Sequence, residues 1–323
     1  MAIPNLLFVD ANIWLDFYRV RNDTGLRLLE HIEALSDRLI VTYQLESEYK
    51  RNRQAALFEG MQELKAPPQI PRPGIFSDAA AAKIMARSVK EAEKRVKKLR
   101  DRVVKALKDP AAQDPVYRSC QRLFHKTDDL TLARDNTLRR AIRRRAFRRF
   151  LHGDPPRKRN DNSIGDAFNW EWMIHCATEK KAGLVIVSRD SDYGATMDKV
   201  SYINDHLRQE FSDRVSRKRK LLLYSRLSDA LKVFDVKVTE QEEQSESELV
   251  SRNPFLNNKV TDLLAAQRAY LASATQSELN FGDMLRLSDL MAWRNRLDPV
   301  PPDPTVEEIL DSVPKSETPK DPK

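Results

Sequence analysis

The sequence predicts an α/β fold in which helices cover a central parallel sheet. Two observations carry this prediction. Four short apolar runs, almost free of charge, have the length of buried strands, and they occupy residues 6–9, 39–42, 184–187 and 221–224. Segments with a helical spacing of apolar residues follow these runs, and strands that alternate with helices are typical of an α/β domain.

The composition limits the class of protein. The chain has 323 residues, of which 41% are hydrophobic, enough for one large domain with appendages. No stretch approaches the ~18 apolar residues of a membrane helix, and the first residues lack the basic start of a secretory signal, so we expect a cytoplasmic protein. Cys120 and Cys176 are too few for a disulfide framework. The net charge of +8 favours a polyanionic partner.

The first half of the α/β domain is predicted to span residues 1–65. Apolar residues at helical spacing predict a helix over 24–37, with Thr24 as its cap. A second helix is predicted over 44–64, directly after the strand at 39–42. Four prolines between residues 67 and 73 then interrupt the pattern, so this half of the domain ends there.

Residues 66–157 are predicted to form a basic helical insertion in the domain. Residues 77–108 contain neither Gly nor Pro and predict one long helix, which carries 11 Lys and Arg against 3 Asp and Glu from residue 83 onward. A second basic helix is predicted over 129–151. The insertion therefore separates the two halves of the α/β domain.

The second half of the domain is predicted to span residues 158–237. Helices are predicted over 164–180, 201–212 and 227–233, placed around the third and fourth strands. The chain from residue 1 to residue 237 would then form one domain, with a sheet of at least four strands.

The composition changes after residue 237. Residues 240–248 contain five Glu and no apolar residue, so we expect an acidic, solvated linker over 238–257. A helical extension is predicted over 258–298, through which a second copy or another protein could bind. The stretch 299–323 holds 7 of the 17 prolines and is predicted to be a disordered tail.

Acidic residues lie where three of the predicted strands end. Because the carboxyl ends of parallel strands meet at one edge, where ligands bind, we expect these acids to converge. Carboxylates are the ligands that Mg²⁺ and Mn²⁺ prefer, and such metals activate water for displacement at phosphorus. The candidate ligands are Asp10, Glu48, Asp161, Asp166, Asp190 and Asp192.

Four of these acids also have a purely structural interpretation, and for Glu48 it is that of a plain surface residue of a helix. Asp10, Asp166 and Asp192 stand where aspartates often cap helices or close turns. Asp161 lies in a polar loop five residues before Asp166, so either of the two could be the third acid of the site.

Four segments resemble the motifs of PIN-domain nucleases, in the order and at the strand positions of that family. They are residues 8–14 (FVDANIW), 41–53 (VTYQLESEYKRNR), 164–170 (IGDAFNW) and 185–190 (VIVSRD). The second segment is most similar to PIN-like proteins with Arg-Asn-Arg after the motif Glu, which favours Glu48 over Glu46. The resemblance covers about residues 1–65 and 158–237.

The resemblance implies a Rossmann-like sheet, Mg²⁺ or Mn²⁺, and hydrolysis of phosphodiesters, more often of RNA than of DNA. It implies that Asn12 and Ser188 orient the ligands by hydrogen bonds, and that Asp161 and Asp192 are auxiliary acids. A role in toxicity or defence fits such an enzyme. The metal ligands and catalytic residues that it implies are Asp10, Glu48, Asp166 and Asp190.

Arginines supply the predicted contacts with nucleic acid. Arginines crowd most of the circumference of the second basic helix, and this arrangement is unfavourable unless a polyanion lies nearby. We also expect the two arginines of the Arg-Asn-Arg sequence to contact nucleic acid. The predicted set is Arg51, Arg53, Arg139, Arg140, Arg143, Arg144, Arg145, Arg148 and Arg149.

Two other functions stay open. A haloacid-dehalogenase-like phosphatase also begins with an apolar strand and an Asp, but it needs a second Asp where this chain has Asn12. A nucleic-acid-binding scaffold without activity would have the same basic helices but no assembled metal site. The five histidines form no zinc-binding motif, and the sequence has no Gly-rich phosphate-binding loop.

Overall fold

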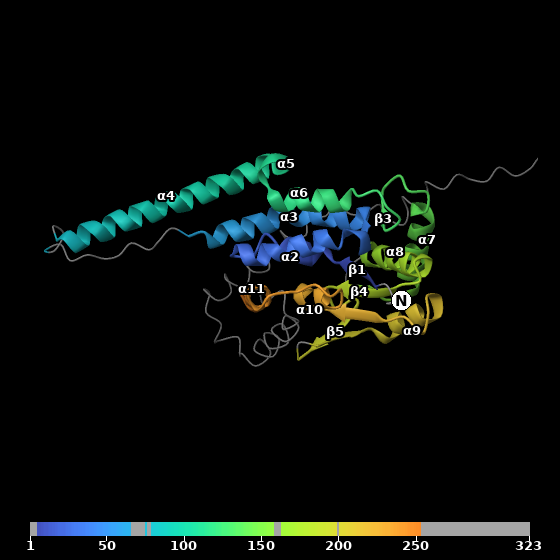
Figure 1. The fold of residues 1–323 in the computed structure, drawn as a ribbon. Coiled ribbons are helices and arrows are strands. Elements are labelled where there is room, and N and C mark those ends of the chain that lie inside the picture. Colours follow the sequence, from blue (N-terminus) through green and yellow to red (C-terminus); the bar gives the residue numbers. More distant parts are fainter. Residues whose placement is uncertain (1–4, 66–74, 76–78, 158–162, 199, 253–323) are drawn as a thin grey trace, which may run out of the picture. The chain divides into compact units, whose positions relative to one another are not determined.

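The computed structural model describes residues 5–65, 75, 79–157, 163–198 and 200–252 (Figure 1). All of them belong to one compact unit, residues 1–263. The extension predicted over 258–298, the tail predicted over 299–323 and the last residues of the predicted linker lie outside the described residues.

A five-stranded parallel sheet stands at the centre of this unit and confirms the predicted fold class. The strand order is β3-β2-β1-β4-β7, and every neighbouring pair is parallel. The carboxyl ends of all five strands therefore share one edge. The strands are β1 (Asn5–Val9), β2 (Leu39–Thr42), β3 (Thr131–Leu132), β4 (Gly183–Val187) and β7 (Leu221–Tyr224).

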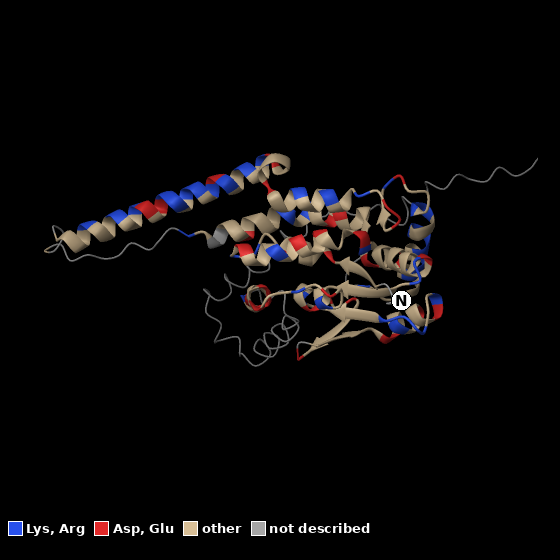
Figure 2. Ribbon diagram, in the orientation of Figure 1, with Lys and Arg blue, Asp and Glu red and all other residues tan. Residues whose placement is uncertain are grey.

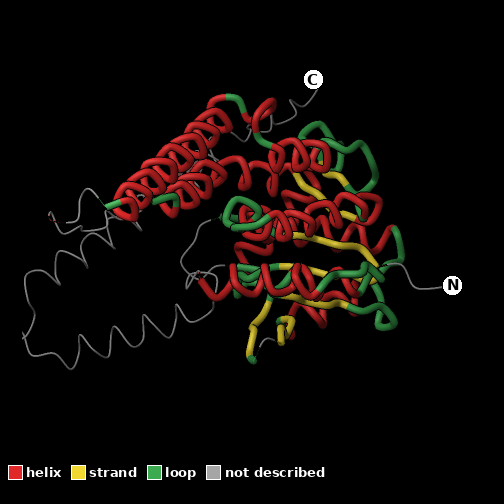
Figure 3. The backbone as a smooth tube through the Cα atoms, turned by 60° about the vertical axis from the view of Figure 1, so that its left-hand side comes forward, coloured by secondary structure: helices red, strands yellow, loops and turns green. Residues whose placement is uncertain are grey.

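Helices pack on both sides of the sheet (Figure 3). α8 contacts β2 and β4, α6 contacts β2, and α10 contacts β4 and β7. The helices of the two domain halves begin and end within a few residues of most of the predicted bounds. They are α2 (Asp23–Ala34), α3 (Tyr43–Glu63), α8 (Gly165–Glu179), α9 (Asp205–Arg214) and α10 (Leu227–Lys232). The short helix α1 (Ala11–Asp16) and the 3-10 turn η1 (Ser36–Arg38) before β2 have no predicted counterpart.

The insertion is helical, as predicted, but it also adds a strand to the sheet. Residues 129–151 do not form one helix, because Thr131 and Leu132 pair with the end of β2 as β3. The side chain of Asp128 accepts hydrogen bonds from the Leu130 amide and the Thr131 hydroxyl, which fixes the turn before the strand. The helices of the insertion are α4 (Ala80–Lys108), α5 (Pro110–Gln113), α6 (Pro115–Phe124) and α7 (Arg139–His152).

A small hairpin replaces the start of the helix predicted over 201–212. Its antiparallel strands are β5 (Gly194–Met197) and β6 (Val200–Ile203), and they form a sheet of their own. The helix, α9, begins only at Asp205, where Asn204 accepts a hydrogen bond from the His206 amide. Strands of four residues are too short for their alternation to stand out in the sequence.

The segment predicted as a solvated linker is helical in its described part and forms α11 (Glu240–Arg252), which contacts α2 and α10. Its acidic residues are not all in solvent, because Glu242 and Glu246 are buried. Glu246 accepts hydrogen bonds from the amides of Leu227 and Ser228 at the start of α10. The carboxylate thus caps a helix, and composition alone did not indicate this role.

Within the part of the chain that the structure describes, no helix combines the length and the apolar character needed to cross a bilayer. The core lies on both faces of the sheet, and its largest fully buried side chains include Trp14, Trp170 and Trp172.

Candidate active site

Asp10 stands directly after β1 and is 2% exposed. Its Oδ1 accepts a hydrogen bond from the Ala11 amide at 2.7 Å, so it does cap the short helix α1. Its Oδ2 accepts hydrogen bonds from Asn12 Nδ2 at 3.0 Å and from Ser188 Oγ at 2.6 Å. Capping therefore occupies one oxygen, while the other is held by the two residues that sequence reasoning expected to orient ligands.

The charge of Asp10 is strongly disfavoured. The pKa of Asp10 is raised from 3.8 to about 8, first by burial and then by the carboxylates of Asp190 and Asp166, although the hydrogen bonds from Ser188 and Ala11 act to lower it. Three acids that are far apart in the sequence therefore act on one another at the carboxyl edge of the sheet. Without a compensating cation, Asp10 keeps its proton at neutral pH.

Tyr193 lies among these acids and was not predicted from the sequence. Its side chain is fully buried, and its Oη has no hydrogen-bond partner among the described residues. Burial raises its pKa well above 10, as do the nearby charges of Asp166, Asp10, Asp192 and Glu48. Four candidate site carboxylates thus act on one hydroxyl, and nothing in the local sequence distinguishes Tyr193 from an ordinary core tyrosine.

One hydrogen bond links the start of α3, the helix that carries Glu48, to α8, the helix that carries Asp166. Thr42, the last residue of β2, caps α3 by accepting a hydrogen bond from the Leu45 amide. The same hydroxyl donates to Asn169 Oδ1 of α8 at 2.6 Å. Glu48 lies two turns into α3 and Asp166 in the first turn of α8, so this hydrogen bond fixes their relative position.

The loop after β4 is held by a buried cation. Asp190 lies in this loop, and its amide donates to Ser188 Oγ at 3.1 Å. The neighbouring Arg189 is buried, with an ion pair to Asp16 and its Nη2 at 3.6 Å from Glu246 Oε1. The loop is therefore anchored both to α1 and to α11, which the sequence did not indicate.

The donor chemistry of this site suits a hard divalent cation. The candidate ligands are carboxylates, and two of them, Asp190 and Asp166, add to the effect of burial in raising the pKa of Asp10. Among the described residues, however, no three His, Cys, Asp or Glu side chains are already arranged to hold a metal ion. Asp161 lies outside the described residues, whereas Asp166 acts directly on Asp10.

Two predicted nucleic-acid contacts are corrected by the structure. Arg53 is buried and pairs with Asp114 at 2.6 Å, which ties α3 to the start of α6. Arg149 is buried too and pairs with Glu171 and Glu210. These guanidinium groups hold the fold together and cannot reach a phosphate on the surface.

The other predicted arginines divide by exposure. Arg145 is partly exposed and lies 3.2 Å from Glu171. The remaining arginines of α7 form no ion pair with the described residues, and Figure 2 shows basic residues along this helix and along α4. We call this set the α7 surface: Arg139, Arg140, Arg143, Arg144 and Arg148.

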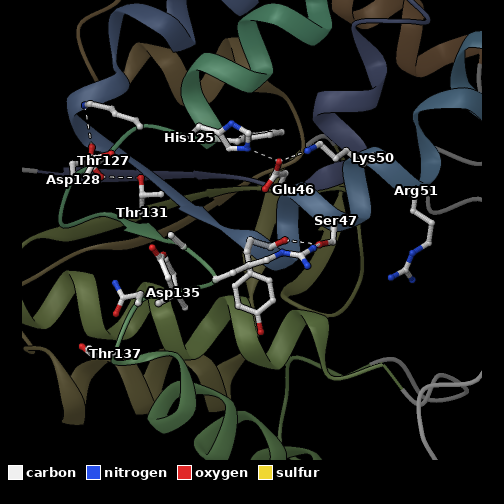
Figure 4. Close-up of a pocket in the computed structure, with 17 residues that line it drawn as sticks. Glu46, Ser47, Lys50, Arg51, His125, Thr127, Asp128, Thr131, Asp135 and Thr137 are labelled. Carbon is white, nitrogen blue, oxygen red and sulfur yellow. Dashed lines mark hydrogen bonds and ion pairs between the residues drawn. The ribbon is translucent and has the colours of Figure 1, made fainter. Parts of the chain in front are cut away.

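A groove of about 1070 Å³ lies between α3 and the chain that leads from α6 to α7 (Figure 4). Figure 4 shows Glu46 between His125 and Lys50. Its Oε1 lies 2.8 Å from His125 Nε2 and 2.5 Å from Lys50 Nζ. Arg51, also on α3, lies at the same groove and makes no ion pair with the described residues. Sequence reasoning did not predict this groove.

A family model described as PIN domain matches residues 7–193. The match contains Asp10, Glu48, Asp166 and Asp190, together with the whole insertion. Proteins with this domain are generally metal-dependent nucleases. No curated protein and no solved structure matches the chain.

Proposed function

Because the chain belongs to the PIN-domain family, we propose that it is a metal-dependent nuclease that hydrolyses phosphodiester bonds in RNA. The observation that carries the proposal is the buried carboxyl of Asp10, on which Asp190 and Asp166 act at the carboxyl edge of a parallel sheet. That edge is where α/β proteins bind ligands. The subgroup with Arg-Asn-Arg after Glu48 stays a prediction.

The site residues have distinct roles in this proposal. Asp10, Glu48, Asp166 and Asp190 hold Mg²⁺ or Mn²⁺, which supplies an activated water and neutralises charge on the phosphate. Asn12 and Ser188 keep Oδ2 of Asp10 in place by donating hydrogen bonds to it. Asp192 is an auxiliary acid beside Tyr193, and Asp161 keeps that role as a prediction. The metal ligands also act as the catalytic residues.

The α7 surface binds the phosphate backbone. Its five arginines carry charge that no described carboxylate compensates, and Arg145 and Arg149 below them hold α7 against α8 and α9. Counterion release favours contact between such a surface and a polyanion. Phosphate contacts carry no sequence information, so this surface adds affinity without specificity.

Cleavage of labelled RNA and DNA single strands, with Mn²⁺ or with EDTA, tests the proposal. We expect cleavage of RNA that needs the metal and that Asp10→Asn abolishes. Cleavage of DNA alone would correct the substrate, and activity that EDTA does not affect would refute the metal role.

A scaffold without activity is the second candidate, and one observation favours it: the described acids are not already arranged as a metal site. It predicts RNA binding without cleavage at any metal concentration. A phosphatase would instead release phosphate from a monoester, and the family match gives that alternative no support.

A further inference from the structure

The groove beside α3 occupies the same edge of the sheet as the acids. The residues that line it include Tyr43, which directly follows β2, and Ala133, which directly follows β3. Asp10 and Asp190 follow β1 and β4, the next strands in the sheet. The groove and the acids therefore follow neighbouring strands along one edge of the sheet.

An aromatic contact joins the groove to α8, the helix that carries Asp166. The ring of Tyr43 meets the ring of Phe168 edge to face, with centroids 5.1 Å apart. Phe168 lies on α8, two residues after Asp166. Tyr43 lines the groove and packs on Phe168, so this end of the groove lies against α8, the helix that carries Asp166.

Arg134 provides a planar cation in this groove. Its guanidinium carbon lies 5.8 Å from the centroid of the Tyr43 ring, and its Nη2 donates to Ser47 Oγ at 3.1 Å. The side chain is exposed and makes no ion pair with the described residues. The guanidinium therefore lies near the Tyr43 ring on an exposed side chain, and arginine planes stack on unpaired bases.

Two of the three acids that line the groove, Glu46 and Asp128, pair with bases of the groove, and the third, Asp135, forms no ion pair with the described residues. Burial favours the neutral form of Glu46, yet hydrogen bonds from Lys50 and His125 lower its pKa below the usual value. Lys126 lies 3.0 Å from Asp128. Arg51 and Arg134 make no ion pair with the described residues, so these two cations favour an anionic, planar ligand.

We propose that this groove binds one nucleotide of a single-stranded substrate, next to the bond that is cleaved. The base stacks on Arg134, and the adjoining phosphate contacts Arg51. A base in a duplex cannot be reached in this way, so the groove selects single strands. This inference rests on the proposed function and adds a base-binding site to it.

The test measures binding of a labelled single-stranded RNA to the Asp10→Asn protein, which does not turn it over. A set of RNAs is used in which each nucleotide in turn is replaced by an abasic nucleotide, which lacks the base. Stacking on one side chain contributes about 1–3 kcal/mol, so we expect one position at which base removal weakens binding roughly 5- to 150-fold. Adding Arg134→Ala should weaken binding of the intact RNA by a similar factor. In that variant, removing the base at the sensitive position should no longer weaken binding.

Two further variants separate stacking from charge. Arg134→Lys keeps the charge but not the planar group. In this variant, as in Arg134→Ala, removing the base at the sensitive position should therefore not weaken binding. Arg217→Ala removes one exposed charge shortly before β7, at the opposite edge of the sheet, and should leave the abasic profile of the parent unchanged.

The outcomes distinguish this inference from the function on which it rests. The inference fails alone if the RNA binds but Arg134→Ala leaves the dependence of binding on each base unchanged. It also fails alone if the Arg134→Lys protein still loses binding when the base at the sensitive position is removed, because charge and not stacking then holds the nucleotide. If no RNA binds to the Asp10→Asn protein, the inference fails together with the proposed function.

Discussion

Replacing Asp10 by Asn should stabilise the protein while it abolishes cleavage. The unfolded chain ionises Asp10 near pH 3.8, whereas burial and the charges of Asp190 and Asp166 hold the pKa of the folded state at about 8. Between these two pH values the folded state keeps a proton that the unfolded state loses, so the stability of the wild type falls as the pH rises. The variant has no proton to lose at this position.

The size of the effect follows from the pKa shift. Each pH unit between the two values costs the folded state about 1.4 kcal/mol, which amounts to roughly 4 kcal/mol at pH 7. The amide must replace a carboxylate that accepts three hydrogen bonds, but Asn12 Oδ1 lacks a partner and can accept one after rotation of its amide. We therefore expect a net gain of about 2–4 kcal/mol, or a rise in Tm of roughly 4–16 °C.

Thermal and urea unfolding at pH 4, 6 and 8 measures the gain. It should be absent at pH 4, grow toward pH 8 and shrink when Mn²⁺ binds the folded wild type. Asp16→Asn is the matched control, because Asp16 is a buried aspartate near Asp10 that pairs with Arg189 and Arg19, so its replacement should destabilise. An Asp10→Asn protein that is less stable at pH 7, or a gain that does not change with pH, would refute the reasoning.

Three further predictions concern other parts of the chain. Asp166→Asn should lower kcat far more than Asp161→Asn, and the reverse order in a cleavage assay would identify Asp161 as the third acid. Changing Arg143 and Arg144 together to Gln should flatten the slope of log K against log salt for RNA by about 1.4 units, and an unchanged slope would remove them from the interface. Arg53→Ala leaves a buried carboxylate unpaired and should lower the free energy of unfolding by about 3–5 kcal/mol, whereas a loss below 1 kcal/mol in urea unfolding would contradict the buried pair.

The sheet and its acids could be predicted because the relevant signals are local. Each of the four apolar runs is a strand, and the parallel order places Asp10 and Asp190 at one edge wherever the helices lie. The two-residue strand β3 could not be predicted, since it exists only through pairing with β2. The hairpin β5–β6 escaped prediction for a similar reason.

The errors about charged residues have a different origin. Arg53 and Arg51 are two residues apart in the same helix, yet one is buried against Asp114 and the other is exposed. Their different roles are set by what packs on each face of α3, and the sequence of the helix does not contain that information. The acidic composition around Glu246 predicts a solvated linker, because its partners, Arg189 and the start of α10, are distant in the chain.

The position of Glu246 has a consequence for the order in which the site is completed during synthesis. A chain made from its amino end contains Asp16 and Arg189 long before residue 246 leaves the ribosome, and domains fold as the chain emerges. Until then the first amides of α10 lack their cap, and Arg189 has Asp16 as its one carboxylate partner among the residues described. The loop that carries Asp190 therefore gains its second anchor only after α11 has been made, so a nascent chain holds its acids less firmly than the finished one.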